Sequence, residues 1–434
     1  MIPRAICRYG VRSIPGDERV VWDAFNRGEA VEGPAITEFE AAFANYHSSK
    51  YAATSSFGRM AFLYILRALD LPKKSEIIFP ALTFWVVPEM ARREGFRPVF
   101  VDVDPRTFNI DPSKIESALS ERTRVIVPTH LYGQPCAMDE IMAIAKKQNL
   151  IVIEDCAQAV GALYRGRCVG TFGTASFFSF QLLKGINTYG GGMALTNDAT
   201  IASRIRKQAK AEPAPTVKDL LQRFLLGYVA RTSVSPKGFT VSGFPIQAAA
   251  SLFGQHDLYQ HVWEKIRPLD RLPRMYHQKY SNVQALLGLR ALSKLDDFNK
   301  RCREHAAMYT QGLSDYRYIE TPKTFPGTNP VYYQYSIYAA DPVATRRRAI
   351  RRGIDVETTH VDVCPKLKLF EEFSTACPGA ERTEEVLQLP VYSRLRASDI
   401  ERVMTVVRTA SMSQKAVSNG RMNPQITGIK KGIT

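Results

Sequence analysis

The chain has 434 residues, a formal net charge of +16 and 45% hydrophobic residues, which is enough for a large α/β domain and a smaller second domain. Without an apolar run of about 18 residues or the apolar core of a secretory signal, the sequence predicts a cytoplasmic protein. The seven cysteines are scattered and form no CxxC pair, which argues against a disulfide framework and a metal site, and no nucleic-acid-binding motif accompanies the positive charge.

From residue 50 to about 210, short apolar runs alternate with segments of helical pattern. The pattern predicts strands at 50–56, 75–82, 97–104, 124–133, 150–155, 175–180 and 191–197, and helices at 58–69, 88–95, 111–120 and 138–149. The strands are mostly β-branched or aromatic runs without strict alternation. Such runs are typical of strands covered on both faces, so we expect an α/β fold with a mostly parallel sheet flanked by helices.

The remainder of the chain has a different pattern. Residues 212–268 are punctuated by proline and glycine and look like an insertion. Helical segments at 280–309 and 397–410, with a strand at 332–340, predict a smaller α+β domain. We therefore expect a large domain over 13–268 that includes the insertion, a small C-terminal domain over 269–411, and a disordered basic tail over 412–434.

Two reactive side chains follow strands that we expect to be neighbours. Asp155 closes the apolar strand 150–155, and Lys184 lies just beyond the strand 175–180. Reactive groups collect at the carboxyl ends of parallel strands. Pyridoxal 5'-phosphate (PLP) needs a lysine that forms an imine with its aldehyde and a carboxylate that pairs with its pyridine nitrogen. Asp155 alone is equally compatible with a metal ligand, a helix cap or an ion pair.

A turn at 55–58 leads from a strand directly into a helix and is a candidate phosphate site. Gly58 allows close backbone approach, and the helix N-terminus offers free N–H groups. Arg59 can add a charged donor. Ser179, on the strand before Lys184, is either a second phosphate donor or a buried hydroxyl bonded to backbone.

Taken together, these blocks resemble a known family. They include GPAITEFEAAFANYHSSKYAATSS, FPALTF, THLYGQPCAMDEIMAIAKKQNLIVIEDCAQAVGALYRGRCVGTFG, FFSFQLLKGINTYGGGMALTND and QALLGLRALSKLDDFN. In order and spacing they resemble the DegT-type (DegT/StrS) nucleotide-sugar aminotransferases, which are PLP enzymes of fold type I, over roughly residues 13–211 and 275–410. The resemblance implies a mostly parallel sheet of the seven-stranded type, a smaller C-terminal α+β domain, and a homodimer in which both subunits build each active site.

The resemblance also assigns roles to residues of this chain. Lys184 becomes the Schiff-base lysine and proton shuttle, and Asp155 becomes the partner of the pyridine nitrogen. The other cofactor-binding residues that it implies are Phe84 on the ring, Gln158 near the ring hydroxyl, and Ser179, Gly58 and Arg59 at the phosphate.

Three features depart from the family pattern. The phosphate turn reads Phe57-Gly58-Arg59 where the family usually has Ser-Gly-Thr. The segment in which a partner subunit usually supplies an asparagine to the phosphate is here 277–280, which leaves His277 as a candidate. The insertion 212–268 replaces a short loop.

The implied function is transfer of an amino group, from glutamate or glutamine, to a keto-sugar that is nucleotide-linked, by a ping-pong cycle in amino-sugar, surface-polysaccharide or secondary-metabolite biosynthesis. Lys184 favours this over sugar dehydration, in which some members carry histidine instead. A second hypothesis is a PLP-binding regulator or pseudoenzyme. The insertion, with Lys218, Arg223 and Arg231 among leucines and aromatics, is compatible with an anionic membrane surface, with the enzyme's own small domain or with a partner subunit.

Overall fold

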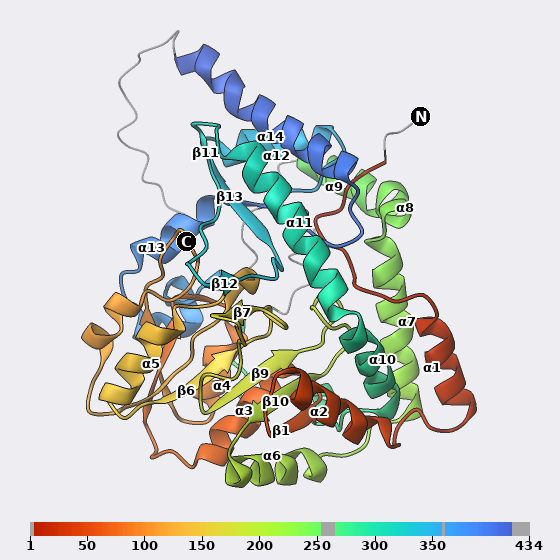
Figure 1. Cartoon of the computed structure of the whole chain (residues 1–434), viewed down its shortest axis with the longest axis vertical. Helices are drawn as coiled ribbons and strands as arrows, with labels where there is room; N and C mark the ends of the chain where they lie inside the picture. Colours follow the sequence, from red (N-terminus) through yellow and green to blue (C-terminus); the bar gives the residue numbers. More distant parts are fainter. Residues whose placement is uncertain (1–3, 253–264, 358–360, 419–434) are drawn as a thin grey trace.

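The computed structural model describes residues 4–252, 265–357 and 361–418, and a seven-stranded sheet forms its centre (Figure 1). Five of the strands run parallel to one another: β9, β6, β5, β2 and β4. Strand β10 is antiparallel to both β9 and β1. The predicted mostly parallel α/β sheet is therefore confirmed. In sheet order the strands are β1 (Tyr51–Ser55), β10 (Gly192–Thr196), β9 (Ala175–Ser179), β6 (Ile151–Asp155), β5 (Thr123–Ile126), β2 (Glu76–Pro80) and β4 (Arg97–Val101).

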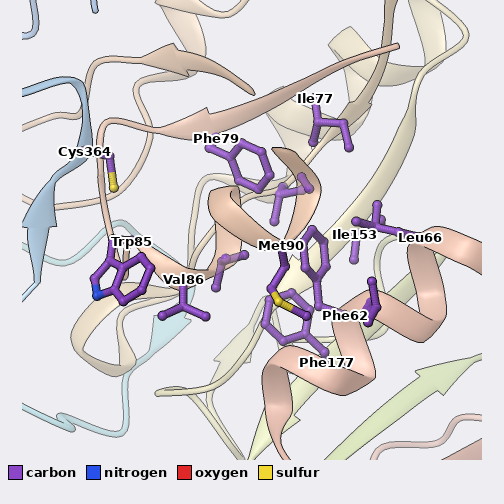
Figure 2. Packing of buried hydrophobic residues seen from close by; sticks show 14 of the residues in the cluster. Phe62, Leu66, Ile77, Phe79, Trp85, Val86, Met90, Ile153, Phe177 and Cys364 are labelled. Atoms are coloured by element: carbon purple, nitrogen blue, oxygen red, sulfur yellow. The ribbon is translucent and has the colours of Figure 1, made fainter. Parts of the chain in front are cut away.

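Two hydrophobic clusters cover the two faces of this sheet, because successive side chains of a strand point to opposite faces. On β9, Phe177 belongs to one cluster and Phe178 to the other. Figure 2 shows the first cluster, where Phe62 of α3 meets Phe177 with 5.0 Å between ring centroids. The helices that flank the sheet are α2 (Ala35–Tyr46), α3 (Gly58–Leu69), α4 (Val86–Arg93), α5 (Met138–Lys147) and α6 (Ala199–Ala211).

A smaller antiparallel sheet lies in the C-terminal part. Its strands are β11 (Ile319–Glu320), β13 (Tyr335–Ala339) and β15 (Val386–Leu389), and its helices include α11 (Leu295–Leu313), α12 (Pro342–Arg351) and α14 (Ala397–Ser418). Its core includes Ile6 from the start of the chain. Helix α10 (Asn282–Ser293), expected in this unit, packs instead on α2. The α+β character agrees with the expectation, and the exact domain boundaries stay a prediction.

Several elements differ from those expected, each for a local reason. The helix expected at 111–120 forms two 3-10 turns, Pro112–Lys114 and Glu116–Ala118, although Asp111 caps the first of them as predicted. The strand expected to reach 133 ends at Ile126, and Pro128 has no N–H to extend the ladder. Helix α14 continues to Ser418, where disorder was expected from 412, and residues 419–434 lie outside the described part. The short remaining elements are β3 (Leu82–Thr83), β7 (Leu163–Tyr164), β8 (Arg167–Cys168), β12 (Thr328–Asn329), β14 (Asp362–Val363) and α13 (Pro378–Arg382).

The insertion is helical, and it packs on the body of the protein. It forms α7 (Val217–Ser233), α8 (Pro236–Gly238) and α9 (Phe244–Leu252), and its residues 253–264 lie outside the described part. Leu220 and Phe224 of α7 are buried in a cluster with residues of α1 (Asp17–Asn26) and α10, beside which α7 runs in Figure 1. None of the helices in the described ranges is long and apolar enough to cross a membrane.

A buried carboxylate, Glu154, ties the loop after β8 to the strand that carries Asp155. Its oxygens accept the N–H groups of Gly170, Phe172 and Gly173 at 2.7–2.8 Å and lie 3.1 Å from Nε2 of His130. Glu154 is fully buried. A buried acceptor that serves this many donors is costly to replace.

We therefore expect E154Q to destabilise the protein by roughly 2–4 kcal/mol, because the amide presents N–H groups to backbone donors that then lose their acceptor. Urea unfolding followed by circular dichroism measures this change. E116Q is the matched control, since Glu116 is about half exposed and its partner is the surface Lys147. Equal unfolding midpoints for E154Q and wild type would show that these hydrogen bonds contribute nothing to stability.

Candidate functional site

Lys184 lies on a loop that leaves β9 and returns as β10. The loop is closed at its base by Phe180, whose N–H donates to the carbonyl of Gly191 at 2.9 Å and whose carbonyl accepts from Thr188 at 3.0 Å. The Lys184 amine lies 4.8 Å from the ring centroid of Tyr333. The amine is therefore held beyond the carboxyl end of the sheet, as the sequence predicts for a reactive group.

Asp155 ends β6, next to β9, and is 4% exposed. Burial raises the pKa of its carboxyl to about 6, against the opposing effects of the Ala157 N–H, which donates at 2.9 Å, and of the Lys184 charge. Burial likewise lowers the pKa of Lys184 to about 8, opposed by the Asp155 charge. The charge of each group therefore acts on the pKa of the other, and the lowered pKa of Lys184 brings its neutral amine closer to physiological pH.

Phe84 and Gln158 come from strand ends next to Asp155. Phe84 follows β3, where the hydroxyl of Thr83 lies 3.4 Å from that of Thr129, a residue that forms a β-bridge with Asp155. The side-chain oxygen of Gln158 accepts the backbone N–H of Tyr132 at 2.8 Å. Both side chains are partly exposed, so each has a face available to a ligand.

The turn before α3 is packed against the end of β9. A Cβ added to Gly58 would lie 2.8 Å from the carbonyl oxygen of Phe178 and 3.0 Å from Cβ of Ser179. Glycine is therefore required there, and it brings Ser179 to the start of α3. The N-cap residue, Phe57, makes no side-chain hydrogen bond to the first turn, so an anion finds N–H groups at this end of the helix.

Arg59 points across this turn into a group of aromatic rings. Its guanidinium carbon lies 4.9 Å from the ring centroid of Tyr276, 5.4 Å from that of Phe84 and 5.5 Å from that of Phe57, and it donates to the Tyr276 hydroxyl. Its charge also contributes to lowering the pKa of Lys184. Arg59 therefore belongs to the same site as Lys184.

His277 is placed differently. Its Nδ1 lies 3.3 Å from both carboxylate oxygens of Glu212, which also accepts the hydroxyl of Tyr64 at 2.9 Å. The imidazole is engaged with this acid of its own chain. The candidate role places His277 at the phosphate turn of a partner subunit and stays a prediction.

Sequence reasoning missed the tyrosines of the site. Tyr333 and Tyr276 come from segments far along the chain, and nothing in their local pattern signals a ligand. Tyr132 lies inside the HLYGQP block, where its backbone takes a positive φ of 55°. That block was a signal for this part of the site, although it did not identify which residue makes the contact.

Comparison with known proteins agrees with this geometry. A family model described as the DegT/DnrJ/EryC1/StrS aminotransferase family matches residues 16–408. The chain is 45% identical over 384 residues to a GDP-perosamine synthase of Caulobacter vibrioides, covering 86% of this chain and 90% of that protein. It is 31% identical to a pleiotropic regulatory protein of Geobacillus stearothermophilus, covering 87% and 90% of the two chains. The crystal structure of S. venezuelae DesV in complex with a ketimine intermediate is similar, with 26% identity, a TM-score of 0.73, and coverage of 91% and 94%.

Proposed function

Because the chain belongs to the DegT/DnrJ/EryC1/StrS aminotransferase family, we propose that it uses PLP to transfer an amino group from an amino acid to a nucleotide-linked keto-sugar. The observation that carries this proposal is that Asp155 ends β6 and Lys184 follows the neighbouring strand β9, close enough that the charge of each acts on the pKa of the other. The name of the Caulobacter relative supports a sugar substrate.

The residues present fit PLP. The cofactor needs an amine, a carboxylate for its ring nitrogen, a flat apolar surface and a phosphate cradle. Lys184, Asp155 and Phe84 offer the first three. Gly58 and Ser179 would form the cradle, because β9 packs so closely against Gly58 that Ser179 lies at the start of α3.

When bound, PLP supplies an electron sink for the carbon that carries the amino group. The chain's own residues do the rest. Lys184 holds the cofactor and then moves the proton at that carbon, and its lowered pKa makes the neutral amine accessible near physiological pH. Asp155 would keep the ring nitrogen protonated, and Gln158 would contact the ring hydroxyl side. Arg59 and Ser179, with the start of α3, would hold the phosphate.

We also propose that the active protein is a homodimer. The resemblance to the family supports this. In the family, the segment that corresponds to 277–280 supplies a residue to the phosphate site of the partner subunit. His277, whose Nδ1 lies 3.3 Å from Glu212 in its own chain, is the candidate for that contact.

A spectrum of the purified holoprotein tests the proposed function. The absorption band of bound PLP is expected to convert to that of pyridoxamine phosphate when glutamate or glutamine is added, and to return when a keto-sugar nucleotide follows. The regulator hypothesis stays open as a second candidate because one relative bears that name. A band that converts with none of the amino acids tried would favour the regulator.

The lowered pKa of Lys184 predicts a pH dependence for cofactor capture. The neutral amine is the nucleophile, and its fraction rises as pH increases through about 8, while Asp155 is already ionised above about 6. The rate at which cofactor-free protein takes up PLP should therefore rise about tenfold from pH 7 to pH 9. Stopped-flow absorbance measures this rate. A rate that is flat over this interval would contradict the assigned pKa.

Substitution of Gly58 tests the phosphate cradle. We expect G58A to weaken PLP retention at least about tenfold and to destabilise the protein by about 1–3 kcal/mol, because the new methyl group overlaps the Phe178 carbonyl. Equilibrium dialysis measures retention. G95A is the control, as a Cβ there meets nothing within 4 Å, although its φ of 86° adds some backbone strain. If G58A retained PLP as well as G95A does, the assignment of Gly58 to the phosphate cradle would be wrong.

A further inference from the structure

One arginine of the insertion lies beside the phosphate turn and has no role in the site as described above. Arg223 is carried by α7, and its guanidinium carbon lies 5.9 Å from the ring centroid of Phe57. Phe57 is the N-cap residue of α3 and directly precedes Gly58. The guanidinium carbon of Arg59 lies 5.5 Å from the centroid of the same ring. Two cations, one from α3 and one from the insertion, therefore meet at the turn where a phosphate is expected.

The glycine run after the reactive loop makes room for the guanidinium of Arg223. Gly190 takes a positive φ of 136°, and a Cβ there would lie 2.7 Å from Nη1 of Arg223. Two residues further along, a Cβ on Gly192 would lie 2.5 Å from the backbone nitrogen of Gly58. One short stretch of backbone thus packs against both the guanidinium and the first residue of α3, which places the two close together.

The packing of α7 fixes where Arg223 lies. The next residue, Phe224, is buried, and its ring centroid lies 6.3 Å from that of Phe25 on α1 and 5.4 Å from that of Tyr189 on the reactive loop. A capping box at Thr216 begins the helix. Because the helix is capped and anchored by aromatic contacts, it holds Arg223 beside the phosphate turn.

The positive charge of Arg223 has no acidic partner close to it. Within the described ranges of the chain it forms no ion pair, and its one hydrogen bond goes to the neutral side chain of Gln278 at 3.3 Å. Burial lowers the pKa of Arg223, against the opposing effects of Tyr280 and of the Asp219 charge. A cation that has lost part of its hydration and has no acid in contact gains most from a bound anion.

We propose that Arg223 binds the phosphate of the cofactor at the start of α3, so that the insertion supplies a charge to this site. This rests on the use of PLP in the proposed function. The phosphate turn of this chain reads Phe57-Gly58-Arg59 and lacks a threonine hydroxyl. A guanidinium compensates for that loss, because its planar fork donates two parallel hydrogen bonds to a phosphate and adds a positive charge.

Binding of PLP and of pyridoxal to cofactor-free protein tests this role. Both ligands present the same ring and aldehyde to Lys184, and only PLP carries a phosphate. The ratio of their dissociation constants, measured by equilibrium dialysis, therefore isolates the phosphate contact. The variants are R223Q, which removes the charge, and R223K, which keeps the charge but not the planar fork. K218Q is the control, because Lys218 is an exposed lysine on the first turn of the same helix.

We expect R223Q to weaken PLP binding by roughly tenfold to a hundredfold and to leave pyridoxal binding within about twofold of wild type. R223K should lie between R223Q and wild type, and K218Q should match wild type. The proposal is overturned if R223Q binds PLP within about twofold of wild type. It is equally overturned if R223Q loses PLP and pyridoxal to the same extent, which is the result that a merely structural residue would give. If thermal melting shows R223Q to be unfolded, R223K decides by the same comparison.

Glutamate added to the PLP-loaded wild type separates this inference from the proposed function. If the PLP band converts and R223Q binds both ligands normally, only the role of Arg223 is lost. If the band never converts but R223Q weakens PLP selectively, transamination is lost and the phosphate contact stands. A wild type that binds PLP no more tightly than pyridoxal has no phosphate contact, and that result overturns the proposal.

Discussion

K184A is expected to lower the transamination rate by at least about 10³-fold, because the variant loses both the amine that holds the cofactor and the group that moves the proton at the substrate carbon. In the structure no other lysine of the described residues has its pKa lowered in this way beside an acid at the carboxyl edge of the sheet. Single-turnover absorbance with glutamate measures the loss on the proton-transfer step.

The matched control for this variant is K147A. Lys147 is 68% exposed and pairs with Glu116 on the surface. Both variants remove one amine, and only K184A should lose activity. If K184A kept more than about a tenth of the wild-type rate, Lys184 would not be the acid–base group assigned here.

D155N should produce the second largest loss, about 10²–10³-fold in the same assay, because a neutral amide no longer keeps the ring nitrogen of the cofactor protonated. The change has a second, independent signature. The Asp155 charge holds the pKa of Lys184 up against burial, so its removal should shift PLP capture by the cofactor-free protein to lower pH.

The control for D155N is D139N, since Asp139 is about half exposed and pairs with Arg165. Its capture profile and rate should match those of wild type. If D155N kept its activity and its PLP capture had the same pH dependence as in wild type, Asp155 would not act on the reactive lysine. Its burial would then be a structural feature only.

The sequence was sufficient to locate the centre of the site because both reactive residues follow apolar strands. The local sequence pattern sets where each parallel strand ends. Because β6 and β9 are neighbours in the sheet, Asp155 and Lys184 lie at the same edge. Gly58 was also predictable, since a strand that turns directly into a helix at a glycine implies close backbone approach.

The rest of the site depends on long-range packing and was not predictable in this way. Tyr333 reaches the amine from a distant part of the chain, and only the closed fold brings the two together. The expected role of His277 rests on the resemblance alone and stays a prediction, and its contact with Glu212 joins residues that are distant in the sequence. The insertion was recognised from its prolines and glycines, but its three helices and where they pack were not predicted.

The most direct test of the account is to reduce the PLP-loaded protein with borohydride and map the peptides by mass spectrometry. Reduction fixes the cofactor to the amine that holds it. We predict a single modified peptide carrying the cofactor on Lys184 and none in K184A. Cofactor found on another lysine, or an unmodified Lys184 in fully loaded protein, would contradict the central claim.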